Sequence, residues 1–252
     1  MAIHRDGLIG IERAAVRAWP AGDTRVVDGW LWRYSGGGSQ RANSVSALSY
    51  EGSDVEVTID AIEALYREHG APVRFQVGFP LSQPEDLDQR LAARGYVIHD
   101  PVTTLLKPVT AVTAPDRVVL REAPSEGWLS VYLSNVTPDR RPFARAILAR
   151  VPAPCAFAEA VRDGAVIATA LGVFYEDTVI AECVGTALEA RRQGAAAAVM
   201  QALEVWGGGL GAHTIGLQAV TTNMPAQGLY ASLGYVPAGT YHYRFLDAGA
   251  AG

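Results

Sequence analysis

The sequence contains the same succession of predicted elements twice, and this repeat limits the fold more than any other feature. Residues 91–97 read LAARGYV and residues 230–236 read YASLGYV, so four of seven positions agree at an offset of 139. Upstream, AIEALYREHG at 61–70 corresponds to VMQALEVWGG at 199–208 at an offset of 138, and a short apolar segment follows each copy. The order helix, strand, helix, Gly-Tyr, strand therefore recurs, which predicts two related halves.

The halves are separated by residues 105–117, LLKPVTAVTAPDR, an extended segment rich in proline and threonine. We place the domain boundary at residue 112, which predicts an N-terminal domain over 1–112 and a C-terminal domain over 113–252. In the second domain we expect strands at 118–121, 156–162, 165–174 and 178–186, a helical stretch interrupted near Thr137 and Pro138, helices from about Gly194 and Pro225, a strand from His213, and a final strand pair around TYHYRF. RDGA and YEDT are expected to turn two hairpins. The fold class predicted is α/β (α+β), with a mixed central sheet flanked by helices.

Composition excludes several classes of protein. Hydrophobic residues make up 49% and charged residues 19%, which predicts a packed globular chain and not a disordered one. The net charge of −5 gives no general attraction to nucleic acid or to an anionic membrane. Cys155 and Cys183 have no nearby cysteine or histidine cluster, so we expect reduced, buried thiols and no metal site. No signal peptide or membrane-spanning run stands out, and we expect a cytoplasmic protein.

The segment VGTALEARRQGAAAAVMQAL, residues 184–203, passes from a predicted strand to a predicted helix without a capping side chain. Ser, Asp or Asn commonly begins a helix because its side chain accepts hydrogen bonds from the first free amides. Here Arg191, Arg192 and Gly194 form the turn, and four alanines follow. Free amides and the positive end of the helix dipole attract a phosphate. The turn therefore predicts either a diphosphate site or a solvated arginine pair at the start of a surface helix.

A second motif favours the diphosphate site. Residues 223–235, NMPAQGLYASLGY, resemble the N-x-x-A-x-x-x-Y-x-x-x-G-[FY] segment of the GNAT N-acetyltransferase superfamily, and RRQGAA at 191–196 is similar to the acyl-CoA pyrophosphate loop of that superfamily, R/Q-x-x-G-x-G/A. The resemblance covers about residues 117–245, and Leu188 departs from it where many relatives have proline. It implies a GNAT acyl-CoA N-acyltransferase fold with acetyl-CoA (coenzyme A) as co-substrate, preceded by a degenerate GNAT-like half.

The resemblance also implies the cofactor-binding positions, which are Val184, Gly185, Thr186, Arg191, Arg192, Gln193, Gly194, Ala195, Ala196, Asn223, Ala226 and Tyr230. The first three would pair with the pantetheine arm through their backbone, as an added strand does, and the next six would hold the pyrophosphate. Asn223 would reach the cofactor from the next loop, and Ala226 would leave room beside it. Tyr230 would also be the catalytic acid that protonates the departing thiolate, the alternative being a tyrosine packed in the core.

The reaction that the resemblance implies is direct attack of a primary amine on the thioester. At pH 7, deprotonating a lysine-like amine of pKa ~10.4 costs about 4.6 kcal/mol, whereas an α-amine of pKa ~7.8 costs about 1 kcal/mol. Glu182 is a charged residue within the apolar strand VIAECVGT and is the candidate catalytic base. Its alternatives are an exposed strand edge or a structural ion pair, and His242 is a second candidate base. The acceptor stays open among small amines, amino acids, antibiotics and protein amines.

The first copy lacks the residues that this chemistry needs. At the two offsets, Arg191 and Gly194 correspond to Ser53 and Glu56, while Asn223 and Tyr230 correspond to Pro84 and Leu91. We therefore expect residues 1–112 to be non-catalytic and to pack against the second domain. The segment DGWLWRYSGGGSQRANSV either shapes the acceptor pocket or forms a core strand pair; its notable residues are Trp30, Trp32, Tyr34, Arg41 and Asn43.

Two other functions compete with the enzyme. A catalytically inactive acyl-CoA sensor or assembly module would keep the loop without the chemistry. A dinucleotide-binding oxidoreductase has little support, because GGGLG at 207–211 follows a predicted helix and not a strand. The partners expected are an amine acceptor and, because strand edges are exposed, a second copy of the chain in a homodimer.

Overall fold

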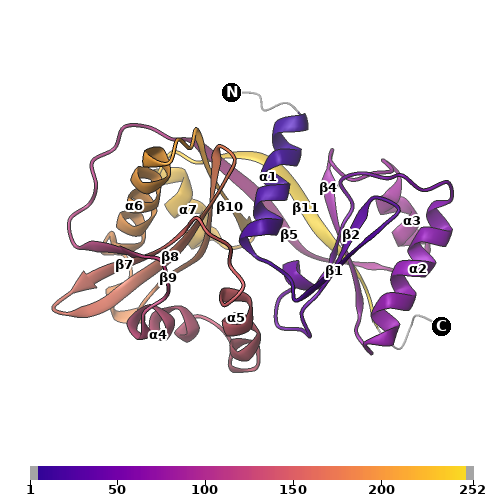
Figure 1. Ribbon diagram of the computed structural model, residues 1–252, viewed down its shortest axis with the longest axis horizontal. Helices are drawn as coiled ribbons and strands as arrows, with labels where there is room; N and C mark the ends of the chain where they lie inside the picture. Colours follow the sequence, from indigo (N-terminus) through magenta and orange to yellow (C-terminus); the bar gives the residue numbers. More distant parts are fainter. Residues whose placement is uncertain (1–4, 248–252) are drawn as a thin grey trace.

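Eleven strands form one continuous mixed sheet in the computed structural model, which describes residues 5–247 (Figure 1). The strands of the first half are β1 (Asp23–Val27), β2 (Trp30–Tyr34), β3 (Val45–Ser46), β4 (Val73–Phe79) and β5 (Val97–Pro108). Those of the second half are β6 (Val118–Arg121), β7 (Cys155–Arg162), β8 (Ala165–Tyr175), β9 (Thr178–Thr186), β10 (Thr214–Val220) and β11 (Val236–Leu246). The order across the sheet is β1-β2-β3-β4-β11-β5-β10-β9-β8-β7-β6.

Seven α-helices cover the sheet in the described part of the chain. They are α1 (Arg5–Ala18), α2 (Val55–Glu68), α3 (Leu87–Ala93), α4 (Glu126–Ser134), α5 (Arg141–Leu148), α6 (Ala195–Gly209) and α7 (Met224–Ser232). Short 3-10 turns occur at Arg41–Asn43, Pro138–Arg140 and Leu188–Ala190. None of the helices within residues 5–247 is long and apolar enough to cross a membrane. Helix α1 crosses the middle of the molecule, between the two halves (Figure 1).

The repeat read from the sequence is present in the topology. The elements α2, β4, α3 and β5 follow one another as α6, β10, α7 and β11 do. Strand β11 lies between β4 and β5 and is antiparallel to both, while β5 pairs with β10. The last strand of each half therefore pairs with the next-to-last strand of the other half: β5 pairs with β10, and β11 pairs with β4. The repeated order of elements is confirmed, and the boundary at residue 112 stays a prediction because the sheet is continuous.

The strand and helix predictions for the second half were accurate except at its end. Strands 118–121 and 178–186 have the predicted bounds, and RDGA and YEDT turn the two hairpins. The final strand pair expected around TYHYRF is wrong, because these residues belong to the single eleven-residue strand β11. Their partners are strands of the first half and not a neighbouring segment.

Each half has an apolar core, and a further core joins the two halves. In the first half, Trp30 and Trp32 are fully buried with Phe75 between the sheet and α2. In the second half, α6 and α7 cover one face of the sheet. On the other face, α1 of the first half packs with α4 and α5 of the second half. The tryptophans of the segment DGWLWRYSGGGSQRANSV are thus core residues, as the alternative interpretation expected.

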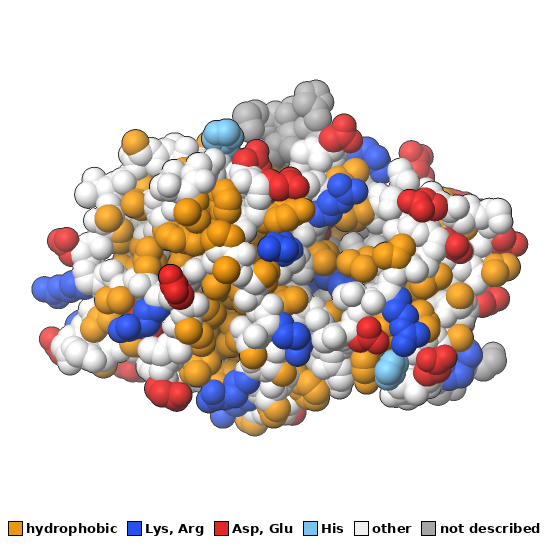
Figure 2. All heavy atoms as spheres, in the orientation of Figure 1, with side chains coloured by type: hydrophobic (Ala, Val, Ile, Leu, Met, Phe, Trp, Pro, Cys, Tyr) orange, Lys and Arg blue, Asp and Glu red, His pale blue; other side chains and the backbone are white. Residues whose placement is uncertain are grey.

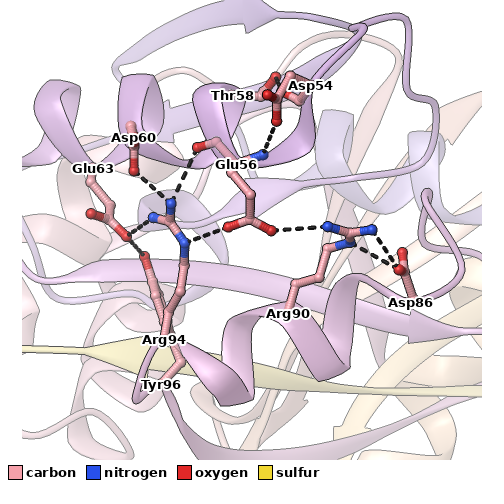
Figure 3. Close-up of polar contacts among 9 residues, drawn as sticks. All are labelled: Asp54, Glu56, Thr58, Asp60, Glu63, Asp86, Arg90, Arg94 and Tyr96. Carbon is pink, nitrogen blue, oxygen red and sulfur yellow. Dashed lines mark hydrogen bonds and ion pairs between the residues drawn. The ribbon is translucent and has the colours of Figure 1, made fainter.

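Helices α2 and α3 of the first half are joined by a network of ion pairs (Figure 3). Glu56 pairs with Arg90 at 3.0 Å and with Arg94 at 2.8 Å, and Arg94 also reaches Asp60 at 2.7 Å. The backbone amide of Glu56 donates to Asp54, which caps the start of α2. Acidic side chains are frequent on the right-hand side of the surface in Figure 2, where the first half lies. Helix α2 corresponds to α6 in the repeat, and its capped, acidic start does not suit a phosphate.

This network predicts a small pH-dependent contribution to stability. The hydrogen bond from Arg90, followed by that from Arg94, holds the pKa of Glu56 below its ordinary value. A lowered folded-state pKa stabilises the protein above the unfolded-state pKa, and this stabilisation is lost as pH falls through the folded-state pKa. We expect Glu56→Gln to lower the free energy of unfolding at pH 7 by less than about 1 kcal/mol, because the pair is exposed. The difference from wild type in urea unfolding should shrink as pH falls toward 3.

Glu68→Gln on the same helix is the matched control, because Glu68 forms no ion pair with any described residue. Its unfolding should follow wild type at both pH values. A Glu56→Gln difference that does not change with pH would contradict the electrostatic explanation.

Candidate active site

Strands β9 and β10 separate at the centre of the second half. They pair in parallel only from Thr178 to Ile180 on β9, although β10 stays paired with β5 to Val220 and β9 stays paired with β8 to Thr186. A β-bulge lies where they part: Cys183 and Val184 together oppose one residue of β8, and Cys183 has a φ of 55°. A bulge bends its strand and ends regular pairing. The backbone of residues 181–186 therefore faces a gap and not a neighbouring strand.

The predicted pyrophosphate loop lies beyond the end of β9, at the start of α6. Gly194 is the residue before the helix, with a left-handed φ of 81°, and no side chain caps this helix end. The first amides of an α-helix have no partner within the helix, so those of 195–197 point out of the helix start. A Cβ at this position would meet nothing within 4 Å, so the site does not require glycine for lack of space. Glycine is favoured here because it adopts a positive φ without strain.

The polar side chains of the loop turn away from these amides. Gln193 donates to the Glu189 carbonyl at 2.9 Å and accepts from Arg162, which comes from the end of β7. Arg191 donates to Asn135, the residue that ends α4, at 3.0 Å. Gly194 and Ala195 at the helix start line an open pocket together with Arg117, Arg162 and Asp116, so two cations lie beside the uncapped helix end, which suits a diphosphate.

A cavity of about 390 Å³ lies on the opposite face of the sheet from α6 and α7. It is bounded by residues of both halves, among them Trp19, Arg41, Glu182, Gln218 and Tyr241. We call it the central cavity. The glycine-rich loop between β2 and β3 brings Arg41 into it, and the gap between β9 and β10 borders it through Glu182 and Gln218.

Glu182, the predicted base, is buried and paired with Arg41. Two guanidinium nitrogens of Arg41 donate to the two oxygens of Glu182, and the guanidinium carbon lies 5.6 Å from the centre of the Trp19 ring. Burial disfavours the charge on Arg41, but the Glu182 carboxylate holds the pKa of the guanidinium above its ordinary value. The pair thus joins the two halves at the cavity, and Arg41 contacts both carboxylate oxygens.

Tyr230 and Asn223 lie on the α7 side of the sheet. Tyr230 is buried beside Tyr235, at 5.9 Å between ring centres, and no described residue forms a hydrogen bond with its hydroxyl. Burial, followed by the charge of Glu182, raises the pKa of Tyr230 to about 12. Asn223 caps α7 by accepting from the Ala226 amide at 3.3 Å. His242 pairs with Asp88 at 2.7 Å in the first half and does not line the central cavity.

Residues 8–246 match the family model described as "Probable histone acetyltransferase Rv0428c C-terminal". The chain belongs to this acetyltransferase family. It is similar to the "Uncharacterized N-acetyltransferase YobR" of Bacillus subtilis (strain 168), at 30% identity over 257 residues covering 95% of this chain and 98% of that protein. It also resembles the solved GCN5-related N-acetyltransferase from Kribbella flavida, with a TM-score of 0.71, 17% identity and coverage of 97% of this chain and 96% of that one.

A second solved structure matches the tandem arrangement. The "Tandem GNAT protein from the clavulanic acid biosynthesis pathway" superposes with a TM-score of 0.62 at 16% identity, covering 82% of this chain and 75% of that one. The superfamily assignment and fold class made from the sequence are thereby confirmed, and the chain is an acetyltransferase of the GNAT type. The individual site residues stay predictions.

Sequence reasoning missed several side chains that the fold brings to the site. Arg162 lies in the RDGA hairpin motif, which indicates a turn and not a ligand, and no motif includes Asn135 or Gln218. Arg41 was among the notable residues of the segment DGWLWRYSGGGSQRANSV, and it is the one of those five that lines the central cavity. Both cysteines are half-buried, where buried thiols were expected, and Cys183 lies in the wall of the central cavity. Within residues 5–247, no group of three or more His, Cys, Asp or Glu is arranged to hold a metal ion.

Proposed function

We propose that this protein transfers the acetyl group of acetyl-CoA to a primary amine by direct attack, and that the amine binds in the central cavity. The observation that supports this most is the gap between β9 and β10. One of its sides borders the central cavity, and β9 leads from it to the uncapped start of α6. A thioester lying in the gap would be reached by a nucleophile from the cavity.

The backbone of Val184, Gly185 and Thr186 would bind the pantetheine arm as an added strand, because their edge facing β10 is unpaired. The amides at the start of α6 would bind the pyrophosphate, with Arg191, Arg192 and Arg162 supplying positive charge around it. These are the groups that a diphosphate requires: open amides, a helix dipole and nearby cations.

Glu182 would receive the proton that the amine loses, directly or through a water molecule. Arg41 occupies both oxygens of this carboxylate, so the base is shared with a permanent cation. An amine that is already neutral in part at pH 7, such as an α-amine, needs less help than a lysine side chain, by about 3.6 kcal/mol. We therefore propose an acceptor with a less basic primary amine, small enough to enter a cavity of about 390 Å³.

Tyr230 would protonate the departing thiolate, because its raised pKa keeps the hydroxyl protonated. A thiolate with an ordinary pKa of ~8.5 leaves well without full protonation, so we expect the acid to contribute less than the usual range of about 100- to 10,000-fold. We expect Tyr230→Phe to lower kcat about tenfold with a change in coenzyme A affinity of less than threefold. Tyr235→Phe, which alters the neighbouring buried tyrosine, should leave kcat near wild type.

The experiment that tests the function is a thiol-detection assay of acetyl-CoA with a panel of amines grouped by basicity. Release of coenzyme A that depends on one amine class, with the acetylated amine seen by mass spectrometry, would support the enzyme. Tight coenzyme A binding with no release across the panel would instead support the acyl-CoA sensor.

A further inference from the structure

A buried chain of polar side chains runs from the first half to the wall of the central cavity. Its centre is Glu12 of α1, which is 5% exposed. Glu12 accepts from the Thr104 hydroxyl at 3.0 Å, from the Gln76 amide nitrogen at 3.0 Å, and from the Gln218 amide nitrogen at 2.9 Å to each oxygen. A buried carboxylate surrounded by donors in this way is fully satisfied in its ionised form.

The direction of each hydrogen bond between these side chains follows from groups that can act only as donors or only as acceptors. The guanidinium of Arg33 can only donate, and it donates to the carbonyl oxygen of the Gln76 side chain at 3.1 Å. The Gln76 amide nitrogen must therefore face Glu12. Burial raises the pKa of Glu12, and the hydrogen bonds from Thr104, Gln218 and Gln76 oppose that rise. The Gln218 nitrogen lies 2.9 Å from each oxygen of Glu12, which is the geometry of an amide group donating to both oxygens of a carboxylate. The side chain of Gln218 therefore presents its oxygen to the other side.

Tyr241 of β11 is the next member and the one at the cavity. Its hydroxyl donates to the side-chain oxygen of Gln218 at 3.2 Å, and the residue lines the central cavity. A phenol has one proton. The Gln218 oxygen can only accept, so the hydrogen bond between the two side chains uses the Tyr241 proton. While this bond is made, the Tyr241 oxygen has only its lone pairs to offer, to the neighbouring Tyr243 hydroxyl or to a molecule in the cavity.

We infer that the Tyr241 hydroxyl accepts a hydrogen bond from an N–H of the acceptor amine, and that Glu12 and Gln218 are positioning residues that fix this direction. The inference rests on the proposed function and assigns an acceptor-binding role within it. The direction matters because a neutral amine attacks through its nitrogen lone pair. A hydroxyl that donated to this nitrogen would occupy the lone pair, whereas one that accepts an N–H holds the amine and leaves the lone pair available.

Tyr241→Phe removes the hydroxyl and keeps the ring. We expect kcat/KM for the acceptor to fall about three- to tenfold, the size of one lost neutral hydrogen bond, mainly through a higher acceptor KM. The KM for acetyl-CoA should not change. Tyr66→Phe is the matched control: Tyr66 is a buried tyrosine whose hydroxyl donates to the Arg33 carbonyl at 2.9 Å, and it does not line the cavity. It should change neither KM, although it also removes a buried hydroxyl.

Gln218→Met tests the positioning role in a double-mutant cycle. We expect a two- to tenfold higher acceptor KM from Gln218→Met alone, and no further increase when it is added to Tyr241→Phe, because Gln218 acts through the Tyr241 hydroxyl. Effects that multiply would overturn the positioning role. A wild-type acceptor KM in Tyr241→Phe, or an equal rise in the acetyl-CoA KM, would overturn the assignment of Tyr241 while the wild-type enzyme still turns over. Absence of amine-dependent turnover in the wild type would instead overturn the proposed function, and this inference with it.

Discussion

Substitution of Gly194 by glutamate is expected to raise the Kd for coenzyme A at least 100-fold, which corresponds to about 2.7 kcal/mol. The new carboxylate would lie at the start of α6, where the proposed diphosphate would receive amide hydrogen bonds. The carboxylate would repel the diphosphate because both are negatively charged. It would also interact with the positive end of the helix dipole in place of the diphosphate. A side chain fits sterically, since nothing lies within 4 Å of a Cβ built on Gly194. The measurement is isothermal titration calorimetry with coenzyme A.

Gly211→Glu is the matched control for this variant. Gly211 lies just beyond the other end of α6, has a φ of 89° against 81° for Gly194, and also has nothing within 4 Å of a Cβ. The two variants therefore share the charge change and the strain of a left-handed residue with a side chain. Coenzyme A should bind to Gly211→Glu with nearly wild-type affinity. If Gly194→Glu bound coenzyme A within tenfold of wild type, the diphosphate would have to lie elsewhere.

The parts of the site that sequence reasoning located are those encoded locally. The loop at 191–196 could be predicted from six consecutive residues, because they include a glycine and no side chain that caps the helix. The hairpins of β7, β8 and β9 are equally local, since Asp163 and Gly164 fix the first turn. The tandem repeat was visible because the corresponding helices, strands and Gly-Tyr pairs recur at nearly constant offsets.

The parts that sequence reasoning did not locate depend on contacts between distant residues. Strand β11 was expected to form a local pair, but its partners β4 and β5 belong to the first half. Nothing in the letters TYHYRF specifies which strands flank them. Arg41 and Glu182 are 141 residues apart in the chain, and Glu12 and Gln218 are 206 apart. Such pairs become neighbours because β11 pairs with β4 and β10 pairs with β5, which places the two halves side by side.

The pairing of β4 with β11 and of β5 with β10 also gives a physical role to the first half, which we predict to be non-catalytic. Its helix α2 is capped by Asp54, and Leu91 stands at the position that the tyrosine has in the second copy of the repeat. Its residues nevertheless complete the central cavity: Arg41 comes from the loop after β2, and Glu12 orders the wall through Gln218. We expect acceptor selection to depend on residues of the first half, and cofactor binding to depend on those of the second.

The second large effect is expected when the Arg41–Glu182 pair is broken. Arg41→Met would leave the buried Glu182 carboxylate without its counterion, and removing one partner of a buried pair typically costs 3–5 kcal/mol. We expect a loss of this size in the free energy of unfolding, measured as a lower urea midpoint at unchanged m value. Replacing both partners, in Arg41→Met with Glu182→Leu, should recover most of the loss, because paired hydrophobic side chains replace a buried ion pair at little cost.

The double variant separates stability from catalysis. We expect it to fold and to bind coenzyme A, but to lose amine-dependent turnover because the Glu182 carboxylate is absent. Arg25→Met is the matched control for removing an arginine: its pair with Asp23 is 3.7 Å long with both side chains about half exposed, and should contribute less than about 1 kcal/mol. If Arg41→Met were as stable as this control, the pair would not hold the two halves together at the cavity. If the double variant turned over at the wild-type rate, Glu182 would be a structural residue, and the proton would leave the amine by another route.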